Sequence, residues 1–134
     1  TVFTGNSMGG YAAVLFGWLL KADVVQAFSP QIFIDAENRA RAGDLRWSES
    51  IALLPSEPGK LYDLSRLPEV MSNFTTSITV HVGDCEPLDV IHARHLRLAI
   101  PRVRVVEYPG EGHRLVRSLR ETGELERVLL DELA

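Results

Sequence analysis

The sequence predicts an α/β fold, a parallel sheet of about four strands flanked by helices. Short β-rich runs recur at residues 24–28, 77–82 and 102–108, and another opens the chain at residues 1–4. Segments with apolar residues at helical spacing lie between these runs. Turn-forming residues end them. Strands that alternate with helices in this way are typical of a parallel sheet covered by helices on both faces.

The elements of the first third follow in order. Residues 1–4 form the end of a strand, and residues 10–21 carry apolar side chains at helical spacing, small ones first. Residues 24–28 are a second strand, ended by Ser29-Pro30. Between the first strand and its helix lies a glycine-flanked serine.

Residues 31–76 are less regular. Residues 37–42 and 49–54 are the best helical pieces, and Pro55, Pro58, Gly59 and Pro68 punctuate the rest. We expect a loop-rich excursion or lid within a single domain that spans residues 1–134.

The last third returns to regular alternation. Residues 77–82 form a strand that ends at Gly83, residues 88–99 a helix, and residues 102–108 the last strand. A turn-rich loop follows at residues 109–112. One or two helices, interrupted near Gly123, complete the chain.

Composition excludes several classes of protein. The chain of 134 residues has 46% hydrophobic and 24% charged residues, which is ordinary for one globular domain. Its net charge of −4, without a basic block, predicts no nucleic-acid or membrane surface. Cys85 is the only cysteine, so no internal disulfide can form, and we expect a cytoplasmic location.

The most informative feature is Gly-Asn-Ser-Met-Gly at residues 5–9, which matches G-x-S-x-G, the nucleophile elbow. In this motif a serine sits on a strained strand-to-helix turn with its hydroxyl exposed. Glycines on both sides, here Gly5 and Gly9, are expected because the turn is too tight for side chains. The strand before and the helix after Ser7 fit this context.

A serine hydroxyl needs a base to take its proton, and the base needs a third group to orient it. The acidic cluster Asp84, Glu86 and Asp89 follows the third predicted strand, and His113 follows the fourth in a glycine-rich loop. Parallel strands bring such loops to one edge of the sheet, where ligands bind. We therefore expect these groups to meet Ser7 there.

Other side chains have less specific patterns. His81 falls in mid-strand and is expected to be a core residue. His92 and His95 share a helix face, for which a solvated face is favoured over a metal pair. Trp47 and Tyr62 are expected to pack the excursion onto the sheet, although with Arg46 and Asp63 they can line a pocket. Ser29-Pro30-Gln31 follows the second strand, so we expect it at the same edge of the sheet, where it would form a wall of the pocket.

Residues 5–11, 83–88 and 110–113 together resemble the C-terminal half of α/β-hydrolases, and the resemblance covers nearly the whole chain. Members commonly carry G-x-x-D after the penultimate strand, with the aspartate as triad acid. Here that position is Glu86, so we rank Glu86 first as the acid, Asp89 second and Asp84 third. The remaining two carboxylates are expected in turns or helix caps.

The resemblance also implies an oxyanion hole, with one N–H from Met8 at the start of a helix. The second N–H comes, in this family, from a loop after an earlier strand. We therefore expect the chain to be a fragment that lacks N-terminal strands and is nearly inactive alone, because losing one such donor costs about 10²–10³ in rate.

The sequence thus predicts a serine hydrolase that acts on a small-molecule ester through an acyl-enzyme, with Ser7, His113 and Glu86 as the triad and no metal or cofactor. An acyltransferase or a peptidase would use the same residues. The alternative from another class is a non-catalytic α/β-hydrolase-like binding module.

Overall fold

The computed structural model describes residues 1–55 and 60–131. Four parallel strands form one sheet, as the sequence predicts, and their order in the sheet is β1-β2-β3-β4. They are β1 (Val2–Asn6), β2 (Val24–Phe28), β3 (Ser77–Gly83) and β4 (Arg104–Tyr108). Consecutive strands are neighbours in the sheet, so their carboxyl ends lie along one edge.

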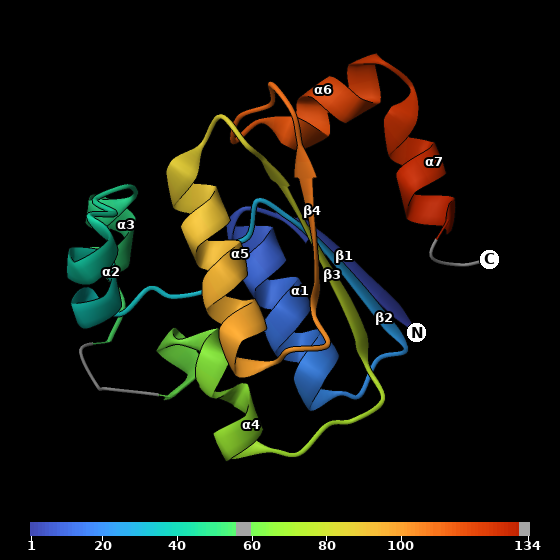
Figure 1. The fold of residues 1–134 in the computed structure, drawn as a ribbon. Helices are drawn as coiled ribbons and strands as arrows, with labels where there is room; N and C mark the ends of the chain where they lie inside the picture. Colours follow the sequence, from blue (N-terminus) through green and yellow to red (C-terminus); the bar gives the residue numbers. More distant parts are fainter. Residues whose placement is uncertain (56–59, 132–134) are drawn as a thin grey trace.

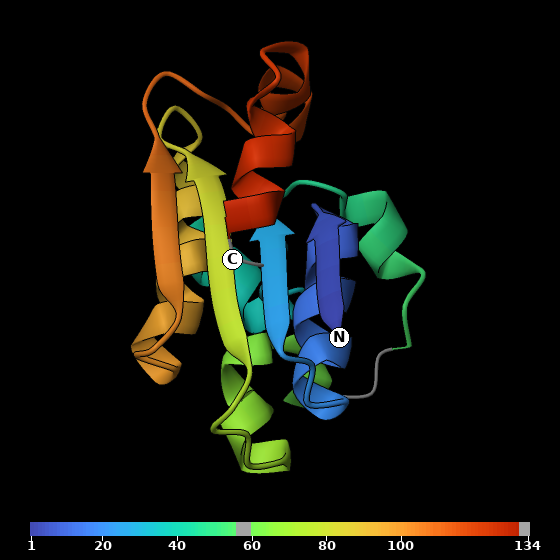
Figure 2. The ribbon, with the colours of Figure 1, turned by 90° about the vertical axis from the view of Figure 1, so that its right-hand side faces the viewer.

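Two helices cover one face of the sheet (Figures 1 and 2). These are α1 (Met8–Leu19) and α5 (Pro87–Ala99), which run between strands in the order that the sequence predicts. The main hydrophobic core lies beneath them, where Val14, Val25, Val80 and Leu96 have no exposed surface. Gly17 lets α1 approach the sheet closely, since a Cβ there would lie 2.2 Å from the Val25 side chain.

The opposite face is covered by α6 (Leu115–Glu121) and α7 (Glu124–Asp131), which lie across the sheet from α1 and α5 (Figure 1). A second, smaller core forms there from Phe28, Leu115, Leu119 and Val128. Gly123, with a φ of +79°, makes the break between the two helices that the sequence predicts. On the outer strand β1, Val2, Thr4 and Asn6 are exposed. The sequence predicts helices over both faces of the sheet, but this face is only partly covered.

The long segment between β2 and β3 contains α2 (Ala36–Ala42), α3 (Ser48–Ala52), the 3₁₀ turns η1 (Lys60–Tyr62) and η2 (Leu64–Arg66), and α4 (Leu67–Val70). The predicted helix at 49–54 ends early, at Ala52, and the predicted turn residues Pro58 and Gly59 lie outside the described residues. Within the described residues, no helix is long and apolar enough to cross a bilayer.

Buried contacts fasten this segment to the helical layer. Leu64 and Leu67 are fully buried in the main core. The indole N–H of Trp18 on α1 donates to the carbonyl of Met71 at 2.8 Å, and the Tyr11 hydroxyl donates to the carbonyl of Leu61. The segment is thus packed against α1 at several points along its length.

Candidate active site

Ser7 occupies a strained turn between β1 and α1. Its φ of 57° and ψ of −117° are unfavourable for any residue other than glycine. Gly5 is required before it, because a Cβ there would lie 2.0 Å from the Gly9 carbonyl oxygen. The second close contact is at Gly10, where a Cβ would lie 2.8 Å from the Pro30 Cβ, whereas a Cβ on Gly9 would meet nothing within 4 Å. The motif's second glycine is therefore not the one that the packing needs.

The end of β2 holds this turn in place. The Ser7 N–H donates to the Phe28 carbonyl at 2.9 Å, and the Gln31 N–H donates to the Ser7 carbonyl at 3.2 Å. Ser29, Pro30 and Gln31 are all buried. The segment that we expected as a wall at this sheet edge thus supports the elbow from beneath.

Three side chains form a hydrogen-bonded chain, from the β1–α1 turn, the first turn of α5 and the loop after β4. His113 Nε2 lies 3.1 Å from Ser7 Oγ, and His113 Nδ1 lies 2.7 Å from Asp89 Oδ2. Asp89 is fully buried in the first turn of α5, and a carboxylate can only accept, so Nδ1 carries a proton and donates it. When the imidazole is neutral, Nε2 is then free to accept the Ser7 hydroxyl proton.

The hydrogen bonds place Asp89, ranked second from the sequence, where Glu86 was expected. Glu86 is the N-cap of α5, and its carboxylate accepts from the Leu88 N–H at 3.1 Å. Asp84 accepts from the Gly110 N–H at 2.8 Å. Asp89 reaches His113, and Glu86 does not, because Asp89 lies three residues into the helix and points from its first turn toward the sheet edge.

Backbone contacts keep the His113 loop beside the end of β3. The Cys85 N–H donates to the Glu111 carbonyl at 2.9 Å. Gly83 permits this approach, because a Cβ there would lie 2.1 Å from the Glu111 carbonyl oxygen. Gly110, with a φ of +78°, turns the loop after β4. These contacts position the His113 imidazole beside Ser7.

Arg46 is a site residue whose role sequence reasoning missed. Its guanidinium donates to the second oxygen of Asp89 at 2.8 Å and makes two bonds of 3.0 Å to Asp44. Burial opposes its charge, but the hydrogen bonds and charges of Asp44 and Asp89 raise the pKa of Arg46. An arginine in a loop gives no pattern that points to a carboxylate 43 positions away, so only the fold reveals this contact.

Asp44 extends the network to α5. Its Oδ2 lies 2.8 Å from His92 Nε2, while His92 Nδ1 accepts from the Ile32 N–H at 2.9 Å. Burial raises the pKa of Asp44, but hydrogen bonds from His92 and Arg46 outweigh it and hold this pKa well below its usual range. His92 is therefore a neutral imidazole with its proton on Nε2.

Trp47 lies at the site. Its ring centroid is 5.2 Å from that of His113, the Arg46 guanidinium stacks on it at 4.5 Å, and 36% of its surface is exposed. The expectation that Trp47 packs the excursion onto the sheet is therefore wrong, because its partly exposed ring contacts Arg46 and His113. The Tyr62 hydroxyl donates to the Pro55 carbonyl at 2.8 Å, which is a bond within the excursion and not one onto the sheet.

The remaining histidines have structural partners. His81 is a buried core residue, as expected, between Tyr108 and Gln26 at 2.9 Å each. The expected solvated face for His92 and His95 is wrong. His92 is fully buried and stacks on Phe33, and His95 bonds to Asp63 at 3.0 Å. Among residues 1–55 and 60–131, no three His, Cys, Asp or Glu side chains are grouped as a metal site.

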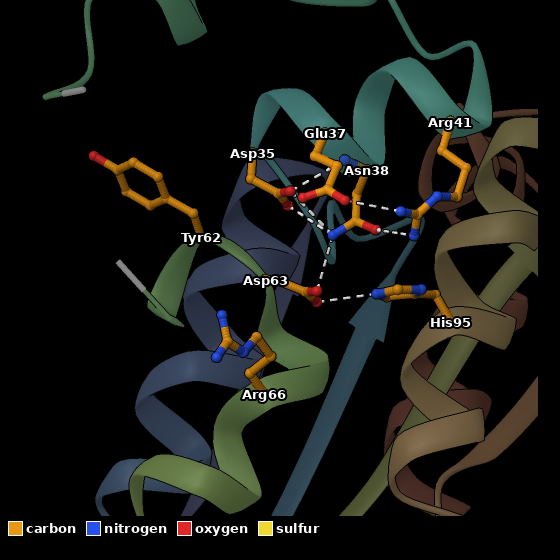
Figure 3. A pocket seen from close by; sticks show the side chains of 8 residues that line it. All are labelled: Asp35, Glu37, Asn38, Arg41, Tyr62, Asp63, Arg66 and His95. Atoms are coloured by element: carbon orange, nitrogen blue, oxygen red, sulfur yellow. Dashed lines mark hydrogen bonds and ion pairs between the residues drawn. The ribbon is translucent and has the colours of Figure 1, made fainter. Parts of the chain in front are cut away.

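A separate polar pocket of about 480 Å³ lies between α2, η2 and α5 (Figure 3). Its charged groups bond mainly to one another. Asp63 bonds to Asn38 and His95, and Arg41 bonds to Glu37. Burial raises the pKa of Asp63, but hydrogen bonds from His95 and Ser65 outweigh it and lower this pKa to about 2. The pocket is lined by Asp35, Glu37, Asn38, Arg41, Tyr62, Asp63, Arg66 and His95, none of which belongs to the Ser7–His113–Asp89 chain.

No protein-family model matches the sequence, and no curated protein sequence matches it significantly. Solved structures do match the fold. A thermophilic esterase from Thermogutta terrifontis aligns with 99% of this chain and 56% of its own, with a TM-score of 0.63 and 16% identity. An α/β-hydrolase enzyme from the sediment metagenome of the Mar Chica lagoon, Morocco, aligns with 98% of this chain and 61% of its own, with a TM-score of 0.63 and 12% identity.

An acyl-transferring enzyme is also among the similar structures. The capsule O-acetyltransferase of Neisseria meningitidis serogroup A aligns with 90% of this chain and 54% of its own, with a TM-score of 0.60 and 13% identity. The chain thus spans between about half and two thirds of the length of these proteins. Together with the parallel sheet, these likenesses show that the chain has an α/β-hydrolase fold.

Proposed function

We propose that the chain carries the nucleophile, base and acid of a serine hydrolase that acts on a small-molecule ester through an acyl-enzyme. The observation that carries the proposal is the hydrogen-bonded chain from Ser7 through His113 to Asp89. Its spacing is the one that general-base activation of a serine requires. The esterases among the similar structures support the ester class.

In this mechanism Ser7 Oγ attacks the ester carbonyl carbon while its proton passes to His113 Nε2. The tetrahedral intermediate collapses as His113 returns that proton to the leaving alkoxide, which departs as an alcohol. A water molecule then gives a proton to His113 and attacks the acyl-enzyme. Collapse of the second intermediate releases the acid and restores the Ser7 hydroxyl.

Asp89 is the triad acid in this proposal. Its buried carboxylate holds Nδ1–H in place and stabilises the imidazolium that forms when His113 takes a proton. Arg46 holds the other oxygen of Asp89, so that the carboxylate keeps one orientation. Glu86, first in the sequence ranking, stays outside this role because it caps α5.

Met8 is proposed as an oxyanion donor. It is the first residue of α1, where a backbone N–H has no partner within the helix, and the helix dipole there favours negative charge. The residues between β2 and β3 supply one wall of the site in this proposal, since Trp47 lies beside His113. This wall is the part of the 31–76 excursion that we propose to contact substrate.

An acyltransferase is the second candidate, favoured by the similarity to the O-acetyltransferase. It would use the same groups, with an alcohol in place of water in the second half-reaction. Offering an alcohol acceptor to the acyl-enzyme separates the two, because an acyltransferase forms a new ester faster than free acid.

Reaction with a fluorophosphonate probe tests the proposal itself, because only an activated serine reacts quickly. We expect mass spectrometry to place one adduct on Ser7, and we expect Ser7→Ala to abolish it. His113→Gln should slow labelling strongly, while His95→Gln, on the same helix as Asp89 but bonded to Asp63, serves as the matched histidine control. Absence of rapid labelling at Ser7 would favour the non-catalytic binding module, and labelling that His113→Gln leaves unchanged would reject His113 as the base.

A further inference from the structure

A groove of about 240 Å³ opens beside His113 and is basic. It is lined by Asn6 at the end of β1, by His113, and by residues of the loop and helix that follow: Arg114, Val116, Arg117 and Arg120. The three arginines are spaced three residues apart, so they lie along one face of α6. Leu115 and Leu119, on its other face, are buried in the second core.

Two of these arginines have no partner in the described part of the chain. The Arg117 side chain is paired with Glu121 at 3.1 Å, but the side chains of Arg114 and Arg120 form no hydrogen bond or ion pair there. Several other surface arginines are paired, for example Arg41 with Glu37 and Arg66 with Glu69, whereas Arg97 on α5 forms no ion pair within the described residues.

Two features of this arrangement are unfavourable for the helix, whereas Arg120 in its last turn suits the helix dipole. Like charges three or four residues apart destabilise a helix, and a cation such as Arg114 at its N-terminal end opposes the dipole. The chain as a whole carries a net charge of −4, so this basic strip runs against its overall composition. The helix packs on the second core through Leu115, Leu119 and Val116, and the Arg114 and Arg120 side chains take no part in that core.

We propose that this groove binds an anionic oxygen group, a carboxylate or phosphate, on the substrate of the Ser7 site. Guanidinium groups recognise such oxygens with paired, charge-assisted hydrogen bonds. His113 belongs both to the groove and to the bond with Ser7, so the anionic group and the reacting carbonyl would lie next to the same imidazole. The inference rests on the proposed function and names its substrate class as a negatively charged ester.

The first experiment measures binding and needs no turnover. Glutarate and phenyl phosphate are titrated separately into the protein while the NMR signals of the His113 ring are followed. We expect a saturable shift with at least one of them, and about fivefold or more weaker binding in Arg114→Gln/Arg120→Gln, since each exposed ion pair is worth up to about 1 kcal/mol. Arg97→Gln, an exposed arginine on α5, is the matched control and should bind like the unmodified chain.

The outcomes separate the two ligand sources and the two proposals. A shift with glutarate alone assigns a carboxylate, and one with phenyl phosphate alone assigns a phosphate. Arginine-dependent binding without fluorophosphonate labelling of Ser7 would keep the anion site and reject the hydrolase. No shift at His113 with either probe at tens of millimolar, or equal affinity in the double variant, overturns the inference.

A kinetic measurement follows where the protein turns over aryl esters. A 4-nitrophenyl ester with a terminal carboxylate is compared with a neutral ester of equal chain length. We expect the ratio of the two kcat/KM values to fall in the double variant and with added salt, and to stay constant in Arg97→Gln. An unchanged ratio in the double variant counts against the groove as a substrate site.

Discussion

Arg46 and Asp89 form an ion pair, with the guanidinium 2.8 Å from a carboxylate that has no exposed surface. The pair joins the segment between β2 and β3 to the acid that holds His113. Since Arg46 also binds Asp44, one side chain connects the candidate triad with the buried His92. The segment between the strands is therefore part of the site's support.

Replacing Asp89 tests which carboxylate is the acid. Asp89→Asn keeps the shape but allows the wrong imidazole tautomer, so we expect the rate of Ser7 labelling or ester hydrolysis to fall by about 10³–10⁴. Glu86→Gln should change this rate little, because Glu86 contacts the Leu88 N–H instead of His113. Rates of the two variants are measured side by side, and a larger loss in Glu86→Gln would restore the sequence ranking.

Removing Arg46 leaves two buried carboxylates without their cation. We expect Arg46→Met to lower the free energy of unfolding by about 3–5 kcal/mol, the usual effect of breaking a buried pair from one side. Arg41→Met removes only exposed bonds, to Glu37 and Asn38, and should cost at most about 0.5 kcal/mol. Urea denaturation of both variants checks this. Equal stabilities would mean that water replaces the guanidinium beside Asp89.

The glycines of the elbow are expected to differ sharply. Gly5→Ala and Gly10→Ala place a Cβ against the Gly9 carbonyl and against Pro30, and both should unfold at clearly lower temperature. Gly9→Ala meets nothing within 4 Å and lies in α1, so it should stabilise the chain by about 0.5–1 kcal/mol. Thermal unfolding ranks the three. A severe loss in Gly9→Ala would show that the turn needs both motif glycines after all.

Acid should destabilise the chain through His81. Burial, with a smaller effect of the Arg104 charge, lowers the pKa of His81 to about 4, whereas an unfolded histidine titrates near 6.5. Between these values the unfolded chain binds a proton that the folded chain does not, so stability is complete above about pH 6.5 and falls as the pH drops toward 4. Burial also lowers the pKa of His92, so His92 likewise makes the folded chain less stable as the pH falls.

The measurement is the urea midpoint from pH 7.5 to pH 4.5. We expect wild-type stability to fall by about 3 kcal/mol from His81 alone, at 1.4 kcal/mol per pKa unit. His81→Gln is less stable at neutral pH but should lose correspondingly less on acidification, since one proton-binding group is gone. Parallel pH profiles for the two proteins would show that His81 does not titrate in this range.

Much of this protein follows from local sequence. Alternation of apolar runs gave the order of strands and helices, because each period reports which face of an element is buried. The turn at Ser7 could be predicted from the sequence, because a left-handed backbone between a strand and a helix requires small neighbouring residues. Chain order then brought Ser7, the acidic cluster and His113 to one edge, as parallel strands must.

Tertiary structure decided what depends on direction and distance. Glu86 and Asp89 are equivalent in a list of nearby acids, but the helix turns one toward its own N-terminus and the other toward His113. The contact between Arg46 and Asp89 joins residues 43 positions apart, and no periodic pattern in the sequence indicates it. Periodicity describes one element at a time, whereas these contacts depend on how separate elements pack together.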